Sequence, residues 1–153
     1  MPRRLFWLAA LLLAGASPLS AQLQVNAIRS LAFGTVIPGV ASSVSPSDPV
    51  KSGQLQIKSA TGRTVLIVFT LPTMLNGPAG ATMPISFGAS DAIAVGASTN
   101  NIPVTFDPRV PFIITPVSPP PRMNIFLGGK VTPATNQRAG SYSNTIVMTV
   151  TLL

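Results

Sequence analysis

Proline and glycine constrain the fold of this chain most, because they interrupt nearly its whole length. The chain holds 16 prolines and 12 glycines in 153 residues, and only Pro2, Gly15 and Pro18 precede residue 22. An α-helix of ordinary length cannot continue through so many helix breakers. Glutamate, a good helix former, is absent, whereas Val, Ile, Thr and Phe recur in short runs. The sequence therefore predicts an all-β fold.

Short apolar runs bounded by Pro, Gly, Asn and Ser predict the individual strands. Residues 63–71 are almost continuously apolar, which predicts a central strand with little solvent on either face. Three consecutive prolines within residues 116–122 predict an extended polyproline connection at the surface. About eight strands in a chain of this size are typical of a single β-sandwich domain. The predicted strands are residues 22–36, 53–60, 63–71, 82–87, 102–106, 110–115, 123–132 and 141–152.

The last predicted strand has the clearest pattern. Its residues alternate between an apolar parity, with Asn144 as the polar exception, and a parity of mostly threonine and serine. A period of two over this length predicts one buried face and one solvated face. The apolar parity comprises Tyr142, Ile146, Met148, Val150 and Leu152.

The first residues are typical of a secretory signal peptide. Arg3 and Arg4 precede an apolar run over residues 5–16, and small residues follow up to Ala21. The run is shorter than the roughly 20 apolar residues that a membrane-spanning helix needs. We therefore expect no transmembrane anchor in the mature chain, and an exported protein of the periplasm, outer surface or extracellular space. The alternative is a buried N-terminal helix. The expected division is a signal peptide at residues 1–21 and a β-sandwich domain at residues 22–153.

The chain is poor in side chains that perform chemistry. It contains no histidine, cysteine or glutamate, and its only acidic residues are Asp48, Asp91 and Asp107, which lie far apart in the sequence. General acid–base catalysis and transition-metal binding rely largely on the missing residue types. The sequence therefore predicts a protein that is not an enzyme, with no catalytic residues, metal site or cofactor. An enzyme that used these aspartates would need two of them close together across a cleft.

The positive charge of the chain does not indicate a nucleic-acid partner. Removal of the signal peptide takes away two arginines and lowers the formal charge from +7 to +5. The remaining Lys and Arg residues occur singly, without the clusters and interleaved aromatic residues of a nucleic-acid surface. We interpret them as isolated charges that keep the surface solvated.

Three segments together resemble a known family. They are residues 31–36 (LAFGTV), 127–131 (LGGKV) and 140–150 (GSYSNTIVMTV). Their order and spacing resemble the bacterial secreted family called domain of unknown function 4402, which is similar to spore-coat-U-like and archaic pilin subunits. The resemblance implies an exported, surface-associated, immunoglobulin-like (pilin-like) sandwich without catalytic residues. The proline-rich stretch over residues 103–121 departs from it, so no loop function is carried over there.

The same segments also have structural interpretations. The phenylalanine of the first segment is expected in the core, and the glycine after it at a bulge or turn. The glycine pair of the second segment predicts a bend or a close approach of strands. The tyrosine near the start of the third segment predicts a corner tyrosine bonded to backbone. These landmarks are Phe33, Gly34, Gly128, Gly129, Gly140 and Tyr142.

The pilin resemblance implies assembly by strand exchange, in which a sandwich that lacks its final strand receives one from a neighbour. The last strand would then border a groove through Ile146, Met148, Val150 and Leu152, and Leu23 and Val25 of a neighbour would be the side chains donated. In the alternative, residues 22–36 form the first strand of their own domain and complete the sandwich internally.

Two functions remain open from the sequence. The first is a structural subunit of a surface fibre or coat, with like subunits and a periplasmic chaperone as partners. The second is a stand-alone secreted binding module for a cell-surface polysaccharide, with its site on loops such as residues 76–81 or 107–122.

Overall fold

The computed structural model describes residues 23–58, 63–96, 102–116 and 122–153. These residues form an all-β sandwich, which confirms the predicted fold class. One short 3-10 helix, η1 (Pro78–Gly80), interrupts the strands. The strands are β1 (Gln24–Arg29), β2 (Ser42–Val44), β3 (Gly53–Lys58), β4 (Val65–Thr70), β5 (Met74–Asn76), β6 (Thr82–Ser86), β7 (Ala92–Val95), β8 (Val104–Phe106), β9 (Phe112–Ile114), β10 (Arg122–Leu127), β11 (Gly129–Val131) and β12 (Val147–Leu152).

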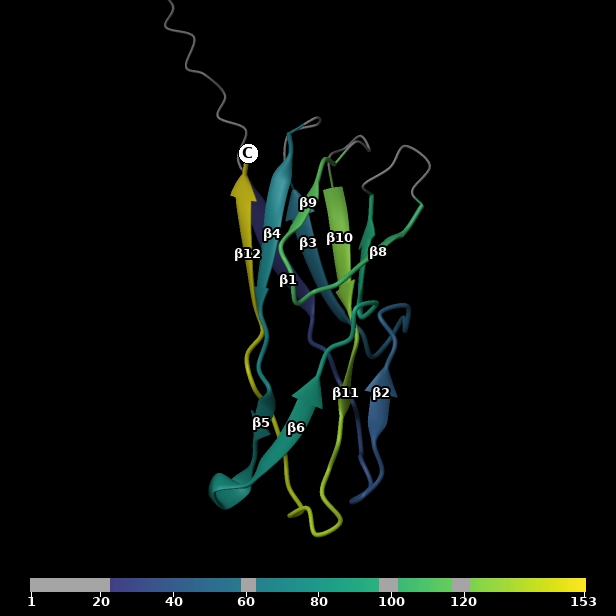
Figure 1. Ribbon diagram of the computed structural model, residues 1–153, viewed down its shortest axis with the longest axis vertical. Coiled ribbons are helices and arrows are strands. Elements are labelled where there is room, and N and C mark those ends of the chain that lie inside the picture. Colours follow the sequence, from purple (N-terminus) through teal and green to yellow (C-terminus); the bar gives the residue numbers. More distant parts are fainter. Residues whose placement is uncertain (1–22, 59–62, 97–101, 117–121) are drawn as a thin grey trace, which may run out of the picture.

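The strands build three antiparallel sheets. A large sheet has the order β1-β3-β10-β7-β8, and a small sheet has the order β12-β4-β9. Figure 1 shows the small sheet in front of the large one in the upper half of the molecule. A lower sheet with the order β2-β11-β6-β5 fills the other end. The lower sheet joins the two layers, because β11 follows β10 of the large sheet and β5 follows β4 of the small sheet.

The core lies between these sheets and follows the alternation of their strands. On β10, buried residues alternate with partly exposed ones, as expected for a strand with one face in the core. The lower sheet contributes a second group of buried residues, so the core is continuous from end to end. The buried cluster comprises Ile57, Val65, Ile67, Met83, Ile85, Phe87, Ala92, Ala94, Phe106, Met123, Ile125, Leu127 and Val131.

Gly128 marks the point where the chain leaves the large sheet and enters the lower one. A Cβ atom at this position would lie 2.4 Å from the carbonyl oxygen of Val44 and 2.7 Å from the nitrogen of Pro46. The Gly128 amide donates a hydrogen bond to the Asp91 carbonyl at 2.8 Å. Backbone atoms of Val44 and Pro46 thus occupy the space that a side chain at position 128 would need. The prediction of a single strand over residues 123–132 is wrong, because two strands, β10 and β11, form on either side of Gly128.

Several predicted strands are longer than the observed ones, and three strands were not predicted. The strand expected over residues 22–36 ends at Arg29, and the strand expected over residues 141–152 begins at Val147. Apolar alternation continues outside both strands, but the backbone there finds almost no ladder partner, apart from one bridge between Ser143 and Asn76. The unpredicted strands β2, β5 and β7 are short and rich in Ser, Ala or Asn, which favour strands weakly.

Two further expectations also need correction. Strand β4 is central in the small sheet, but only one of its faces is buried, since Val68 on the other face is 36% exposed. The surface connection expected over residues 116–122 begins at Pro116, which is fully buried, and ends at Arg122, which belongs to β10. Residues 117–121, and the expected signal peptide at residues 1–21, lie outside the described part of the chain.

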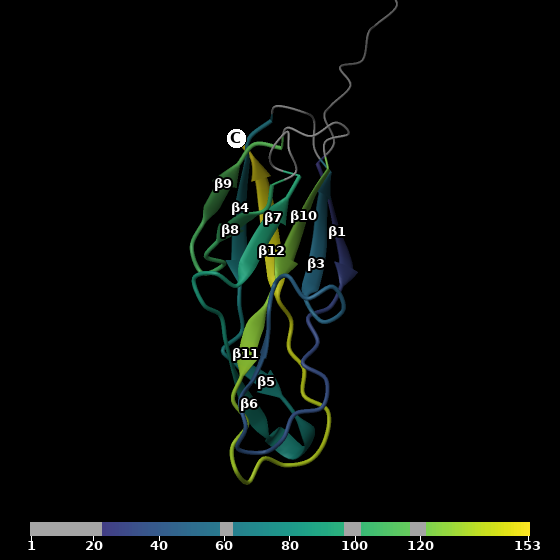
Figure 2. The ribbon, with the colours of Figure 1, turned by 90° about the vertical axis from the view of Figure 1, so that its right-hand side faces the viewer.

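The two lateral sides of the sandwich differ. On one side the chain passes from β8 to β9, and the rings of Phe106 and Phe112 stack there with centroids 4.0 Å apart. Pro108, in the connection between these strands, is fully buried, so this side is closed. On the other side lie the edge strands β1 and β12, and no strand pairing joins them within the described residues. Figure 1 shows β1 and β12 toward the left of the upper half, away from β8, and Figure 2 shows that they belong to different layers, with β1 beside β3 at the right-hand edge.

Candidate functional site: an open apolar seam

The side between β1 and β12, which we call the seam, leaves core-facing side chains uncovered. Val25 of β1 stands opposite Ile57 of β3 in the antiparallel register, so both side chains face the core. Ile57 is fully buried, whereas Val25 is 41% exposed. On β12, Val150 pairs with fully buried Ile67 but is itself only partly buried. The core is therefore covered at its centre and open along this edge.

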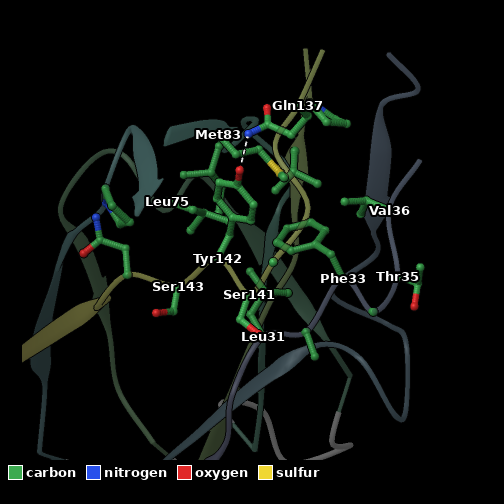
Figure 3. A pocket seen from close by; sticks show the side chains of 18 of the residues that line it. Leu31, Phe33, Thr35, Val36, Leu75, Met83, Gln137, Ser141, Tyr142 and Ser143 are labelled. Carbon is green, nitrogen blue, oxygen red and sulfur yellow. Dashed lines mark hydrogen bonds between the residues drawn. The ribbon is translucent and has the colours of Figure 1, made fainter. Parts of the chain in front are cut away.

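Toward the lower end, the seam widens into a cavity of about 750 Å³. One wall is formed by residues 30–36, which follow β1, and the other by residues 137–146, which precede β12. Figure 3 shows the side chains of Phe33, Leu75 and Met83 gathered around the ring of Tyr142. The floor comes from the lower sheet and is apolar, with Leu75, Met83, Ile85 and Val131.

Both walls of the cavity carry backbone groups without partners. In the wall formed by residues 31–36, the Ala32 amide donates a hydrogen bond to the Lys51 carbonyl at 2.9 Å. Residues 33–36 make no backbone hydrogen bond with any described residue. In the opposite wall, Ser143 exchanges two backbone hydrogen bonds with Asn76, each 2.9 Å long. Ile146, next to β12, has no backbone partner among the described residues. Unpaired backbone beside an apolar floor is the arrangement that an added strand can complete, although Gly34, with a φ of +71°, bends this wall.

Tyr142 fixes one wall of the cavity. Its hydroxyl donates a hydrogen bond to the Arg138 carbonyl at 2.8 Å. It accepts one from Gln137 Nε2 at 2.6 Å, which Figure 3 marks with a dashed line. The ring lies so close to Gly77 that a Cβ atom there would stand 2.3 Å from it. Gly140 begins this turn with a φ of +144°, a conformation that glycine adopts most readily. The tyrosine is thus held by backbone on two sides.

The structure brings most of the sequence-selected residues to the seam. Phe33, Gly34, Gly140, Tyr142 and Ile146 line the cavity. Met148, Val150 and Leu152 continue the same apolar parity along β12, and all three pack against the core. Leu23 and Val25 lie on the opposite rim, in or next to β1 of their own domain.

Two landmarks lie elsewhere, and part of the site was not foreseen. Gly128 and Gly129 mark the crossing between sheets, where a Cβ atom on Gly129 would approach the Phe87 ring to 3.1 Å. The floor residues Leu75 and Val131 could not be assigned to the seam from the sequence, because only long-range strand pairing brings them there. Met83 and Ile85 were also not assigned to the seam, although they alternate with exposed residues along β6, a signal that could have placed them on an inward face.

The three carboxylates each stabilise a local turn. Asp48 accepts hydrogen bonds from the amides of Val50 and Lys51, which lower its pKa. Asp91 accepts one from the Gly88 amide at 2.6 Å. None of the three lines the seam. Among the described residues, no group of three or more His, Cys, Asp or Glu side chains could hold a metal ion.

The pKa of Asp107 offers a direct check of one of these turns. The Arg109 guanidinium donates to both carboxylate oxygens, and this lowers the pKa of Asp107 from its usual 3.8 to about 2. The stabilisation is therefore present above pH 4 and is lost as the pH falls through 2. Carboxyl NMR titration is expected to give an Asp107 pKa of about 2 in the wild type and a higher value, still below the usual 3.8, in Arg109→Gln, because that variant keeps the hydrogen bond from the residue 109 amide. A wild-type value near 4 would contradict the ion pair.

No helix within the described ranges is long and apolar enough to cross a membrane. Comparisons with family models, with curated proteins and with solved structures found no match.

Proposed function

We propose that this protein is an exported, non-enzymatic structural subunit of a surface fibre or coat, and that its seam receives an extended strand from a like subunit. The observation that carries the proposal is the combination of an apolar floor with backbone that is unpaired among the described residues, along one side of the sandwich. The opposite side, closed by Phe106 and Phe112, shows that this fold can seal an edge with its own residues.

A strand placed in the seam would gain two kinds of contact. Its backbone would pair with the free edge of β12, and alternate side chains would cover Met148, Val150 and Leu152. Complete burial of one such side chain contributes about 1.5–3 kcal/mol. These side chains are already partly buried, so each contributes only a part of that range. Several of them together would still be significant beside the stability of a typical domain.

The first strand is the candidate donor. Strand β1 lies at an edge, pairs only with β3, and carries Val25 and Ile28 at 41% and 52% exposure. Leu23 precedes it and completes an apolar set at the start of the domain. For donation, β1 must leave β3 of its own domain and form backbone hydrogen bonds with β12 of a neighbouring subunit. The exposed side chains of β1 would become buried in that exchange, which favours it.

Export is the other part of the proposal. Residues 1–21 have the cationic start, apolar run and small-residue end of a signal peptide. A subunit with an open seam needs protection between export and assembly, because free edges and apolar grooves promote aggregation. A periplasmic chaperone that occupies the seam would supply that protection.

Size-exclusion chromatography with negative-stain microscopy of the chain from residue 22 tests the assembly. We expect oligomers or fibres, and we expect an excess of a peptide that copies residues 22–31 to convert them to a complex of one chain with one peptide. The control peptide carries serine in place of Leu23 and Val25 and should have no effect. A stable monomer that ignores both peptides would overturn the proposal.

A further inference from the structure

The outer face of the large sheet carries a ladder of amide side chains. Residues opposite each other in antiparallel strands point to the same face of the sheet. The amide residues are opposite one another in the register, and along β3 and β10 they alternate with the residues that face the core. The amides therefore point away from the core, on three neighbouring strands. They are Gln24 and Asn26 of β1, Gln54 and Gln56 of β3, and Asn124 of β10.

Hydrogen bonds within the ladder leave ligand-binding groups free. Asn124 Oδ1 accepts from Gln54 Nε2 and from Gln56 Nε2, both at 3.3 Å. Each amide has both donor and acceptor capacity. Apart from these two bonds, the described residues give no partner to the Asn124 amide nitrogen or to the two glutamine side-chain oxygens. Donors and acceptors in alternation suit a ligand made of hydroxyl groups, which also donate and accept.

Two cations stand side by side at one end of the ladder. Lys58 of β3 is directly opposite Arg122 of β10, with Gln24 on the other side of Lys58. Like charges in this position destabilise a sheet unless an anion neutralises them. No side-chain carboxylate of the chain can do so, because Asp48, Asp91 and Asp107 are all held in turns elsewhere. The face is therefore complementary to a negatively charged ligand.

An aromatic ring extends the same face at the other end of the ladder. Phe126 of β10 is opposite Gln54 and, on its other side, opposite Ile93 of β7. It is partly exposed, unlike the buried residues on either side of it in the strand. Such a ring offers an apolar platform for the C–H face of a sugar.

We propose that this face binds an acidic polysaccharide. Cations, amides and a phenylalanine occur here in neighbouring rows of three paired strands, over residues Gln24, Asn26, Gln54, Gln56, Lys58, Arg122, Asn124 and Phe126. A nucleic acid fits less well, since it favours more cations and several aromatic platforms. The loops expected from the sequence are not needed for this site. The seam lies between the two sheets rather than on this outer face, and donation of β1 to a neighbour would leave the face with its residues on β3 and β10, including both cations.

Binding of polygalacturonate to the purified chain tests the inference, with dextran as the uncharged control. We expect binding that weakens with added salt and exceeds that to dextran. The double substitution Lys58→Gln with Arg122→Gln should weaken it about tenfold or more, since two charge-assisted contacts are lost. The matched double substitution Lys51→Gln with Lys130→Gln removes equal charge from exposed positions outside the ladder, and should change it less than about twofold. Asn124→Ala should weaken it without any change of charge.

Four results would overturn the inference. They are no binding of polygalacturonate, equal binding of dextran, equal loss in both double variants, and tighter binding of single-stranded DNA than of polygalacturonate. Circular dichroism of every variant keeps the comparison valid, because the substituted side chains lie on the surface and the sheet should stay folded.

Discussion

Substitution of Val150 by lysine is expected to abolish assembly, whereas substitution of the adjacent Thr149 by lysine should leave it intact. The two residues are neighbours on β12, but Val150 is on the parity that faces the core and Thr149 is exposed. Both variants gain the same charge and the same length of side chain. Any difference between them therefore reports which face of β12 takes part in assembly.

The expected difference follows from the open side of the sandwich. In the isolated subunit, a lysine at position 150 can extend its ammonium group through the seam to water, while its methylene groups stay on the core. An inserted strand would close that path and leave the charge buried without a partner, which costs far more than an assembly contact returns. The variant should therefore fold and remain monomeric.

Chromatography and thermal unfolding separate these outcomes. We expect Val150→Lys to elute as a folded monomer with a distinct melting transition and to ignore the peptide of residues 22–31. We expect Thr149→Lys to assemble as the wild type does. Assembly of Val150→Lys at the wild-type level would show that the seam is not the contact. If Val150→Lys fails to fold, the milder Val150→Thr should reduce assembly while Thr149→Val does not.

The amino-acid sequence predicts side-chain direction better than strand pairing. Alternation toward the end of the chain correctly places Ile146, Met148 and Val150 on the core side. The same alternation at Tyr142 does not produce a continuous ladder, since this segment makes only one bridge, between Ser143 and Asn76, and Asn144 contacts the Met74 carbonyl through its side chain. Periodicity describes which face of a segment is apolar. Pairing depends on which distant segment lies beside it.

Residues 31–36, on the opposite side of the seam, also show that apolar periodicity does not predict strand pairing. Their apolar pattern is that of a strand, and Leu31 and Phe33 do pack against the core. No neighbouring strand lies within reach of Gly34 or Thr35 among the described residues, so the segment stays outside every sheet. The sequence predicts Phe33 in the core, and the structure places it in one wall of the seam. Its apolar floor was not predictable, because long-range packing forms it.

The outer face of β4 was misjudged for a related reason. A continuous apolar run predicts burial on both faces, but Leu66 and Val68 face a surface shared with Thr149, Thr151 and Ile113. This surface has β-branched and apolar side chains and no charge, so it packs well within its own sheet without a covering layer. Apolar composition alone does not distinguish a strand that is buried on both faces from a strand whose outer face is exposed.

Substitution of Gly128 by alanine is expected to destabilise the fold strongly. The added Cβ would overlap the Val44 carbonyl oxygen and the Pro46 nitrogen, both backbone atoms that cannot rotate away. Gly88→Ala is the matched control, since its Cβ would meet only the Asp91 carboxylate at 3.4 Å, an ordinary contact. Both glycines lie near the Asp91 turn, so the variants differ mainly in the space available.

We expect Gly128→Ala to lower the free energy of unfolding by roughly 3 kcal/mol, as overpacking against rigid atoms does. For a domain of this size that corresponds to a fall in the melting temperature of about 10 °C. Gly88→Ala should shift it by less than about 2 °C, since its new Cβ makes only an ordinary surface contact. Equal melting temperatures for the two variants would show that β10 and β11 do not cross beside β2 as described. Because the crossing at Gly128 carries the chain from the large sheet to the floor of the seam, Gly128→Ala should also weaken binding of the residue 22–31 peptide, and Gly88→Ala should not.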